Sequence, residues 1–501
     1  DNDRLSIRIE GNGAVLIPVG NDYRAGAKYT GDISLGNAFL SDRWKPLSLK
    51  DETRQGTDLV EVVDEKTKLC RLKTTLPDMD GTDMQIRIPQ WYTVSDYPVQ
   101  KISKGYVYFT AGDLEYLSSR KCYNVNYDYA LEQLYPRYAV YNVKDHGRFC
   151  IDKGRVYLPA GITSVHECTA SEFLVLYKNR IRSFEMRDIQ FVGSGSKDRL
   201  LYVRANTAAR VLVTGCTFRA IRNTILGIHS SDNVCFVGNT VEDCSGNTVD
   251  SAAGCKKTIV RDNTITGNGG YIRNNFCITC YGEDFYIADN RISDFGYCAI
   301  RTGYNYKWKK SSLLKGIIEN NEIWFSDSFA ADGWKYTLMD GGAVYVSTQN
   351  DETIIRYNNI HDIAGVHSFR GIYCDDGTQN TAVYGNVVRN IKGSYTIFLR
   401  RSNVDKYVPR SNDGNIVMYN IVDGPYKFEG RKDGTCIHGS NLVLSTGNES
   451  PKVVLNTLSH QEKDIQSEGT LDGEGRITVS SEARRQVKSL PCYAKIKQWI
   501  N

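Results

Sequence analysis

The amino-acid sequence predicts an all-β protein whose main part is a parallel β-helix with three short strands in every coil. Three observations indicate this fold. One short pattern recurs from about residue 180 onward, the chain is rich in turn-forming Gly (44) and strand-forming Tyr (32), and no helical periodicity accompanies the pattern. A unit that stacks on itself also explains a length of 501 residues without several separate domains.

The repeat reads apolar-x-apolar-x-x-Asn-x-apolar, so two short strands flank an Asn. The marker is Cys216 in a degenerate first copy and Asn in the later copies, at positions 239, 263, 290, 321, 358, 386 and 420. The shortest intervals predict a unit near 23 residues, and the longer ones predict the same unit with insertions. We expect the Asn to adopt the left-handed conformation of a sharp corner. Its amide would bond to the next copy and form a ladder at the ~4.8 Å spacing of paired strands.

The two ends of the chain depart from the repeat. Residues 1–40 contain the first strands of the helix, and residues 41–165 are interpreted as a β-rich inserted module, with a separate N-terminal domain as the alternative. Residues 166–450 form the helix core and its cleft. Residues 451–501 form a C-terminal cap, in which a short helix begins after Ser480 or Ser481 and protects the last coil.

Composition argues against several other classes of protein. A net charge of +4 is close to neutral for this length, so we expect no nucleic-acid partner. No stretch approaches the roughly 18 apolar residues of a membrane-spanning helix. The sequence begins at Asp1 without Met or a signal peptide, as a processed export product or a trimmed chain would. We therefore expect a periplasmic or secreted monomer.

The 14 Cys fall into two groups. Those inside predicted strands are expected to face inward as small apolar residues: Cys235, Cys277, Cys280, Cys298 and Cys374. The spacing of Cys277 and Cys280 is that of a zinc CxxC motif, but a strand sends positions three apart to opposite faces, and no second pair stands nearby. Disulfide bonds remain open among the loop residues Cys70, Cys122, Cys150 and Cys168.

Residues midway between the Asn markers predict a ligand-binding surface. Stacking places the same strand of successive coils side by side. The outward positions of these strands then form one column of mixed chemistry, with His229, Asp250, Arg301, Tyr345, Asp375, Arg400 and Glu429. A purely structural face would more often hold Thr, Ser, Asn and Lys. The mixture of acids, arginines and aromatic residues therefore suggests an anionic or sugar-like ligand.

Two acidic positions stand out on this surface. Asp340 precedes a predicted strand, and Asp375 with Asp376 ends another. Only one marker, Asn358, separates them, so they belong to adjacent coils. Two carboxylates at that range suit general acid/base cleavage of a glycosidic bond, because their proximity raises the pKa of one of them. The competing interpretation is that Asp-Gly is a turn dipeptide and Asp375 a corner residue.

The same region resembles a known family. The run Trp334-x3-Leu338-x-Asp340-Gly341-Gly342-Ala343-Val344-Tyr345, followed by Gly371-Ile372-Tyr373-x-Asp375-Asp376-Gly377-Thr378, looks like the core of the right-handed parallel β-helix glycoside hydrolases. These bacterial exported enzymes degrade polysaccharides and include fucosidase, xylanase and xylosidase members. The resemblance covers residues 180–445 by repeat pattern. It implies that Asp340 and either Asp375 or Asp376 are catalytic, although Cys374 replaces the usual aliphatic residue before the Asp pair.

Further residues are expected to bind the substrate. The tyrosines offer stacking or hydroxyl contacts, the histidines and arginines bind substrate or tune a carboxylate, and the tryptophans offer sugar platforms. The competing interpretation for several of them is packing or a solvated loop charge. The candidates are Tyr345, Tyr373, His367, Arg370, Arg400 or its neighbour Arg401, Arg301, Glu283, Trp334, Trp324 and His229.

The sequence therefore favours an exported glycoside hydrolase that cleaves a polysaccharide or oligosaccharide with paired carboxylates and needs no cofactor or metal. The alternative is a polysaccharide lyase, which needs a base beside a uronate; Arg301, Arg400, Tyr345 and His229 could serve. A third hypothesis is a non-catalytic carbohydrate-binding solenoid. The separation of the two carboxyl groups discriminates further, because about 5–5.5 Å indicates retention and about 6.5–9.5 Å indicates inversion.

Overall fold

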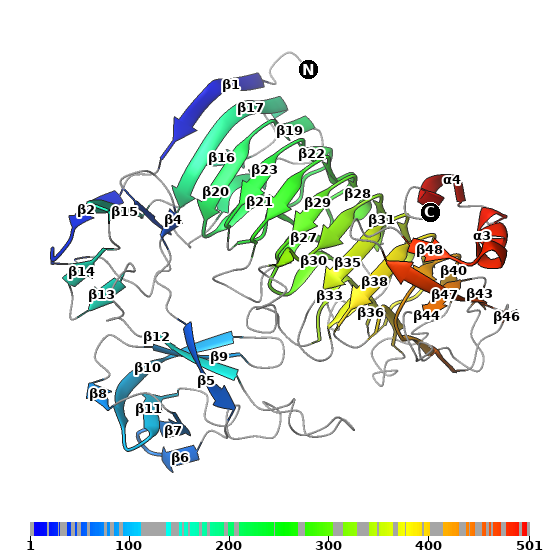
Figure 1. The fold of residues 1–501 in the computed structure, drawn as a ribbon. Helices are drawn as coiled ribbons and strands as arrows, with labels where there is room; N and C mark the ends of the chain where they lie inside the picture. Colours follow the sequence, from blue (N-terminus) through cyan, green and yellow to red (C-terminus); the bar gives the residue numbers. More distant parts are fainter. Residues whose placement is uncertain are drawn as a thin grey trace.

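The structure, a computed structural model, is nearly all β and confirms the predicted parallel β-helix (Figure 1). It describes residues 5–17, 20–28, 30, 38–41, 46–47, 52–57, 61–74, 78–80, 85–89, 94–111, 137–141, 150–152, 155–158, 161–169, 173–177, 181–194, 199–204, 210–244, 246–268, 276–303, 314–327, 340–347, 350–363, 369–375, 377–392, 395–400, 414–429, 437–439, 441–445, 453–456, 460–461, 464–471, 477–489 and 493–497. Among them, no helix combines the length and the hydropathy needed to cross a bilayer.

Each coil contributes one strand to each of three stacked parallel sheets, as predicted. Sheet 1 lies midway between the Asn markers and consists of β16 (Leu174–Tyr177), β18 (Arg199–Arg204), β21 (Thr224–Ile228), β24 (Val249–Ser251), β27 (Phe276–Cys280), β30 (Cys298–Thr302), β33 (Gly342–Val346), β36 (Arg370–Cys374), β39 (Ile397–Leu399), β42 (Tyr426–Glu429) and β45 (Val453–Asn456).

Sheets 2 and 3 precede and follow the markers and meet at the Asn corner. Sheet 2 consists of β19 (Arg210–Thr214), β22 (Val234–Val237), β25 (Ile259–Arg261), β28 (Glu283–Ala288), β31 (Leu314–Glu319), β34 (Asn350–Arg356), β37 (Thr381–Tyr384), β40 (Ile416–Met418), β43 (Ile437–Gly439) and β46 (His460–Gln461). Sheet 3 consists of β20 (Thr217–Ile221), β23 (Thr240–Glu242), β26 (Thr264–Thr266), β29 (Arg291–Ser293), β32 (Glu322–Trp324), β35 (Asn359–Ile363), β38 (Val387–Ile391), β41 (Ile421–Val422), β44 (Leu442–Ser445) and β47 (Ile465–Leu471).

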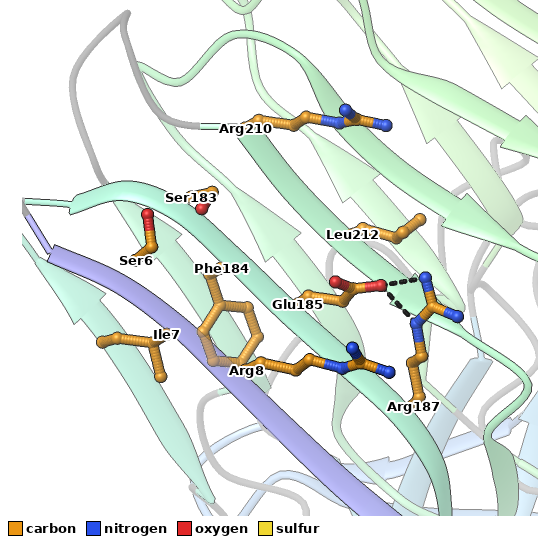
Figure 2. Close-up of a pocket in the computed structure, with 9 residues that line it drawn as sticks. All are labelled: Ser6, Ile7, Arg8, Ser183, Phe184, Glu185, Arg187, Arg210 and Leu212. Carbon is orange, nitrogen blue, oxygen red and sulfur yellow. Dashed lines mark hydrogen bonds and ion pairs between the residues drawn. The ribbon is translucent and has the colours of Figure 1, made fainter.

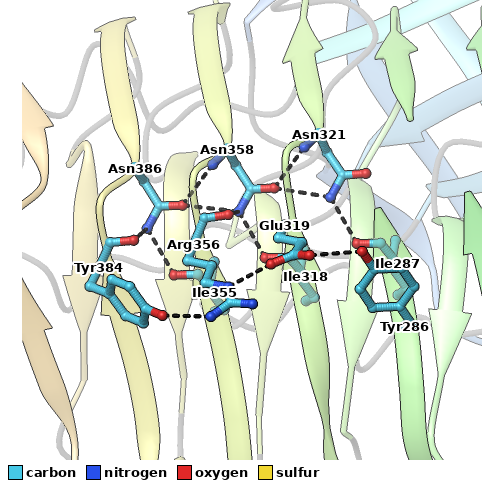
Figure 3. A network of polar contacts seen from close by, with 10 residues as sticks. All are labelled: Tyr286, Ile287, Ile318, Glu319, Asn321, Ile355, Arg356, Asn358, Tyr384 and Asn386. Atoms are coloured by element: carbon cyan, nitrogen blue, oxygen red, sulfur yellow. Dashed lines mark hydrogen bonds and ion pairs between the residues drawn. The ribbon is translucent and has the colours of Figure 1, made fainter. Parts of the chain in front are cut away.

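The asparagine ladder forms at the corner between sheets 2 and 3, as predicted. Oδ1 of Asn358 accepts hydrogen bonds from the backbone N and from Nδ2 of Asn321, at 3.0 and 2.9 Å (Figure 3). Its Nδ2 donates to the carbonyl of Ile318 at 3.0 Å and to Oδ1 of Asn386 at 2.9 Å. Each buried amide therefore ties together successive coils, and such chains of hydrogen bonds strengthen one another.

The ladder is longer than the repeat pattern indicated. Asn420 donates to Oδ1 of Asn441, and Asn441 donates to Oδ1 of Asp464 through its backbone N and its Nδ2, at 3.1 and 3.2 Å. The pattern missed these two members because His438 and Gln461 stand where it requires an apolar residue three positions before the marker.

The left-handed corner residue is not the asparagine, so that expectation was wrong. The positive φ lies one residue earlier, at Gly238 (67°), Asp262 (58°) and Tyr357 (58°) among others. Gly and Asp tolerate this conformation best, which explains why they often precede the marker. The Asn contributes its amide to the ladder, and its predecessor turns the chain.

The cysteines follow the prediction only in part. Cys277, Cys280 and Cys374 are buried in the apolar interior of the coils, as expected. Cys235 is half-buried beside outward residues of sheet 2, and Cys298 packs with aromatic residues outside sheet 1, so the inward prediction was wrong for both. Two of the loop cysteines considered for disulfides lie on strands instead of loops, and both are buried: Cys70 lies on β7 and Cys168 on β15.

The chain leaves the helix after its first strand and returns before β17. β1 (Leu5–Leu16) pairs in parallel with β17 (Ile181–Ser194), whose bend at Asp188 lets it serve both sheet 2 and sheet 3. The intervening strands form antiparallel sheets: β2 (Gly20–Arg24), β15 (Ser164–Cys168), β3 (Ala38–Ser41) and β4 (Pro46–Leu47) in one, β13 (Cys150–Asp152) with β14 (Arg155–Tyr157), and β5 (Glu52–Thr57), β6 (Glu61–Asp64), β7 (Leu69–Lys73), β8 (Met79–Asp80), β9 (Gln85–Pro89), β10 (Val94–Ser103), β11 (Tyr106–Thr110) and β12 (Arg137–Tyr141) in another.

The C-terminal helix covers the flank of the last coils. In α3 (Ser481–Lys488), Ser480 is the N-cap and its Oγ accepts a hydrogen bond from the backbone N of Ala483 at 3.2 Å. Ala483 and Val487 pack with apolar residues on the outer face of sheet 3, including Val387, Ile421 and Leu442. The short elements β48 (Ile477–Val479) and α4 (Tyr493–Ile496) flank it in sequence.

Candidate active site

Outward side chains of sheet 1 form two neighbouring rows instead of the single predicted column. We call this outer face the floor. Its first row contains Asp250, Thr279, Arg301, Tyr345, Tyr373, Phe398 and Lys427. The second row lies two residues further along the strands and contains His229, Tyr281, Asp375 and Arg400. The single-column prediction was wrong because each strand has two inward positions, and alignment on the first apolar residue mixed the two rows.

Asp340 and Asp375 meet on adjacent coils around one hydroxyl group. Asp340 precedes β33 and Asp375 directly follows β36, so two paired strands hold their positions. Oη of Tyr373 lies 3.2 Å from Oδ1 of Asp340 and 2.7 Å from Oδ1 of Asp375. The two carboxylate oxygens are therefore at most 5.9 Å apart, which is the sum of 3.2 and 2.7 Å. The predicted pairing of these acids on neighbouring coils is present in the structure.

Each of the two carboxylates has its own arginine. Nη1 of Arg370 donates to Oδ1 of Asp340 at 2.9 Å, and its guanidinium carbon lies 4.1 Å from the centre of the Tyr373 ring. Nη1 of Arg400 lies 3.7 Å from Oδ1 of Asp375 and 3.4 Å from Oη of Tyr373. These cations offset the repulsion that two close carboxylates would otherwise suffer.

Asp375 is surrounded by hydrogen-bond donors. Oη of Tyr345 donates to its Oδ2 at 2.6 Å, and Oη of Tyr373 donates to its Oδ1. Two tyrosine hydroxyl groups therefore fix the position of both oxygens of this carboxyl group. Burial, and then the charge of Asp375, raise the pKa of Tyr345 and of Tyr373 well above the ordinary tyrosine value, so both remain protonated donors.

The surroundings of Asp340 favour its protonated form. Burial raises the pKa of the Asp340 carboxyl and the nearby Asp375 charge adds to this, while the guanidinium groups of Arg370 and Arg400 oppose it; the net direction is upward. Its side chain is also the more accessible of the two, with 18% of its surface exposed against 5% for Asp375. Asp340 is therefore the carboxyl group better suited to hold a proton and to reach a ligand.

The other predicted site residues lie at varied distances from this pair. Arg301 is in the first row, one coil from Tyr345. His229 is exposed and lies five coil steps from Asp375 along the second row, roughly 24 Å. Glu283 is at the corner after β27, where it forms an ion pair with Lys256 at 3.1 Å instead of joining the carboxylates. Asp376, His367, Trp334 and Arg401 lie outside the described residues.

Trp324 is not available as a sugar platform on the floor. It lies on sheet 3, stacked on the ring of His361 at 6.0 Å, with the guanidinium carbon of Arg291 5.1 Å from its ring centre. His361 belongs to the following coil and Arg291 to the preceding one, so the indole lies between them. Protein groups therefore occupy the stacking surface that a sugar would need.

Sequence reasoning missed the aromatic cluster that supports the carboxylates. Tyr297, Tyr345, Tyr373 and Phe398 pack together outside sheet 1, with Phe398 stacked on Tyr373 at 5.5 Å. Tyr297 also donates through its Oη to the backbone carbonyl of Asp340 at 3.3 Å. The register of Phe398 opposite Tyr373 places it on this outer face although it is apolar.

A pocket elsewhere on the helix contains a single carboxyl group among its lining residues. A shallow pocket on the outer face of sheet 2 near the first coils holds Arg8, Arg187 and Arg210, with Glu185 as the acidic residue in its lining (Figure 2). Glu185 is already engaged by Arg187 within the pocket. Within the described ranges, no group of three or more His, Cys, Asp and Glu side chains is arranged to hold a metal ion.

Comparison with known proteins supports the fold assignment. No protein-family model matches the sequence, and no curated protein matches it. A solved structure titled "Glycoside hydrolase" matches with a TM-score of 0.53 and 11% identity, over 96% of this chain and 84% of that one. An alginate lyase complex (TM-score 0.32, 12% identity, 57% and 59% coverage) and a complex of XylC with xylose (0.36, 9%, 94% and 78%) are more distant. The match to the structure titled "Glycoside hydrolase" shows that the chain shares its fold with a solved carbohydrate-active enzyme.

Proposed function

We propose that the protein is a glycoside hydrolase that cleaves a polysaccharide or oligosaccharide on the floor of sheet 1, with Asp340 as general acid and Asp375 as nucleophile. The observation that supports this most is the contrast between two close carboxyl groups. Asp375 accepts hydrogen bonds on both oxygens, whereas burial favours a proton on Asp340. Glycosidic cleavage needs two neighbouring carboxyl groups, of which one donates a proton and the other attacks the anomeric carbon.

The spacing favours retention of configuration at the anomeric carbon. The upper limit of 5.9 Å between these two oxygens lies below the roughly 6.5–9.5 Å of inverting enzymes and is compatible with the roughly 5–5.5 Å of retaining ones. In this scheme Asp340 protonates the glycosidic oxygen while Asp375 attacks the anomeric carbon. Asp340, now ionised, then removes a proton from the water that releases the sugar from Asp375. Tyr345 and Tyr373 hold Asp375 in place throughout.

The test is an activity screen against plant and host oligosaccharides with analysis of the first product. Hydrolysis adds one reducing end for each cleavage, and proton NMR at early times should show a product with the anomeric configuration of the substrate. An inverted first product would contradict Asp375 as nucleophile. Binding without turnover across the whole panel would favour a non-catalytic solenoid.

A lyase is the second candidate because Arg400 and Arg301 lie beside Tyr373 and Tyr345, as a uronate-neutralising site would require. The raised pKa of both tyrosines argues against either of them as the base, since a general base must ionise near the working pH. Ultraviolet absorbance from an unsaturated product would identify the lyase, and its absence during cleavage would identify the hydrolase.

The alkaline limb of the pH profile should report the proton on Asp340. Activity should fall as the pH rises through the pKa of this carboxyl, which burial places above the ordinary value. Arg370→Met removes the cation that lowers the pKa most, so the limb of kcat/KM should move to higher pH. Arg370→Lys retains the charge and should return the limb toward its original position. A limb that stays fixed in Arg370→Met would show that another group controls it.

A further inference from the structure

We infer that Tyr373 is a positioning residue that serves both carboxyl groups of the site in turn. In the proposed two-step scheme the negative charge passes from Asp375 to Asp340 and back, and the single hydroxyl hydrogen of Tyr373 follows it. This inference rests on the proposed function, because a covalent intermediate is what moves the charge between the two groups. It also replaces the substrate-binding role that the sequence suggested for Tyr373.

The hydroxyl group of Tyr373 lies between the two carboxyl groups. Its Oη is 2.7 Å from Oδ1 of Asp375 and 3.2 Å from Oδ1 of Asp340. A phenol has one hydrogen to donate, so it bonds fully to only one of these oxygens at a time. Nη1 of Arg400 donates to Oη at 3.4 Å, which occupies a lone pair of the hydroxyl oxygen and leaves the hydrogen for the carboxyl groups.

Packing fixes the ring of Tyr373 and leaves its hydrogen able to turn. Phe398 stacks on the ring with the two ring centres 5.5 Å apart, and the guanidinium carbon of Arg370 lies 4.1 Å from the ring centre. Tyr373 is fully buried, so its ring offers no surface to a sugar. Burial also raises its pKa well above the ordinary value, and the hydroxyl keeps its hydrogen. Rotation about the bond between ring and oxygen therefore exchanges one carboxyl partner for the other without moving the side chain.

The charge changes place once in each half of the reaction. In the first step Asp340 gives its proton to the glycosidic oxygen, an oxygen of Asp375 bonds to the anomeric carbon, and the bond from that carbon to the leaving oxygen breaks. Asp375 is then a neutral ester and Asp340 a carboxylate. In the second step Asp340 takes a proton from water, the water oxygen bonds to the anomeric carbon, and the ester bond breaks. The Tyr373 hydrogen bonds to Asp375 before the first step and to Asp340 in the intermediate.

Tyr345 provides a comparison within the same site. Its Oη donates to Oδ2 of Asp375 at 2.6 Å, and among the described residues it forms no hydrogen bond with Asp340. Both tyrosines therefore hold Asp375, but Tyr373 is the one placed to stabilise the ionised Asp340 of the intermediate. Hydrogen bonds to charged groups are the stronger ones, so losing this bond should raise the pKa of Asp340 in the intermediate by about one unit.

Decay of the trapped intermediate tests this role. A fluorinated aryl glycoside of the sugar that the activity screen identifies forms the intermediate, and recovery of activity after removal of the reagent measures the second step alone. Tyr373→Phe and Tyr345→Phe should both slow recovery, because Asp375 leaves with one donor fewer. Asp340 must be ionised to act as base, so recovery falls as the pH falls through its pKa. We expect this acidic limb to lie about one pH unit higher in Tyr373→Phe and to stay at the wild-type position in Tyr345→Phe.

Tyr286→Phe is the matched control, because it removes a bond of the same kind on sheet 2, from Oη to Oε1 of Glu319 at 2.7 Å (Figure 3). Its recovery rate and its limb should equal those of the wild type, and circular dichroism should show all three variants folded. An unmoved limb in Tyr373→Phe, or an equal shift in Tyr345→Phe, would overturn the inference and leave the proposed hydrolase intact. An inverted first product from the wild type would refute the covalent scheme itself, before any variant is compared.

Discussion

Asp340→Asn and Asp375→Asn should each lower kcat by a factor of about 10³ or more while the protein stays folded. General acid/base catalysis contributes about 10²–10⁴, and loss of a nucleophile removes a whole reaction path. Both substitutions keep the size of the side chain, so circular dichroism and the unfolding midpoint should change little. Initial rates of reducing-sugar release on the best substrate of the screen measure the effect.

The two variants should also differ from each other. A substrate with a good leaving group needs little acid assistance, so activated aryl glycosides should rescue Asp340→Asn much more than Asp375→Asn. Asp284→Asn, at an exposed position on β28 where the carboxylate pairs with Lys315, is the matched control and should retain full activity. Full activity in both site variants would refute the assignment of the carboxylate pair.

Asn358→Ala should lower the free energy of unfolding by about 4 kcal/mol. It removes the acceptor for two donors of Asn321 and the donor for Ile318 and Asn386, and each unsatisfied buried group costs about 1–3 kcal/mol. Urea unfolding followed by far-ultraviolet circular dichroism measures the loss. Thr264→Ala, an exposed position in β26, should shift the curve by no more than a few tenths of a kcal/mol.

Asn358→Asp tests the role of the donors separately. The new side chain still accepts from Asn321 but faces the Asn386 oxygen and the Ile318 carbonyl without hydrogens, so its pKa should be raised. Stability should then recover as the pH falls, because a protonated carboxyl can donate again. A loss below about 1 kcal/mol in Asn358→Ala would show that the ladder is incidental to stability.

Most of the fold could be predicted from the sequence because each coil of a solenoid repeats the same sequence pattern. The Asn markers gave the coil boundaries, and residues between adjacent markers gave coil neighbours, which is how Asp340 and Asp375 were brought together before the structure. The repeat pattern gives no information on strand pairing in the segments that do not repeat. Among the described strands of residues 1–40, β1 joins the coil, while β2 and β3 pair with β15 far along the chain.

The details of the site depended on features that the repeat does not encode. Inward and outward positions alternate irregularly along these strands. Tyr373 and Asp375 therefore lie in different rows, and Phe398 lies on the outer face of sheet 1. Spacing gives neighbours along the helix axis but not the direction of a long side chain, so the contact of Arg370 with Asp340 could not be foreseen. Glu283 forms an ion pair with Lys256, and Trp324 stacks on His361. The repeat pattern does not predict these local contacts, because they depend on how the side chains are oriented.

The end of the ladder at Asp464 has a consequence for how long this helix can grow. In these asparagine rungs one amide N–H donates to the side-chain oxygen of the next coil, so the row runs in one direction and each member requires an acceptor beyond it. Asp464 accepts from Asn441 and from the hydroxyl of Tyr426, and an ionised carboxylate has no hydrogen to pass on. Asp464 therefore ends the row of side-chain hydrogen bonds, because it has an oxygen where asparagine has an NH₂ group. Duplicated coils inserted before Asp464 could lengthen the ladder, whereas the ladder itself does not continue through Asp464.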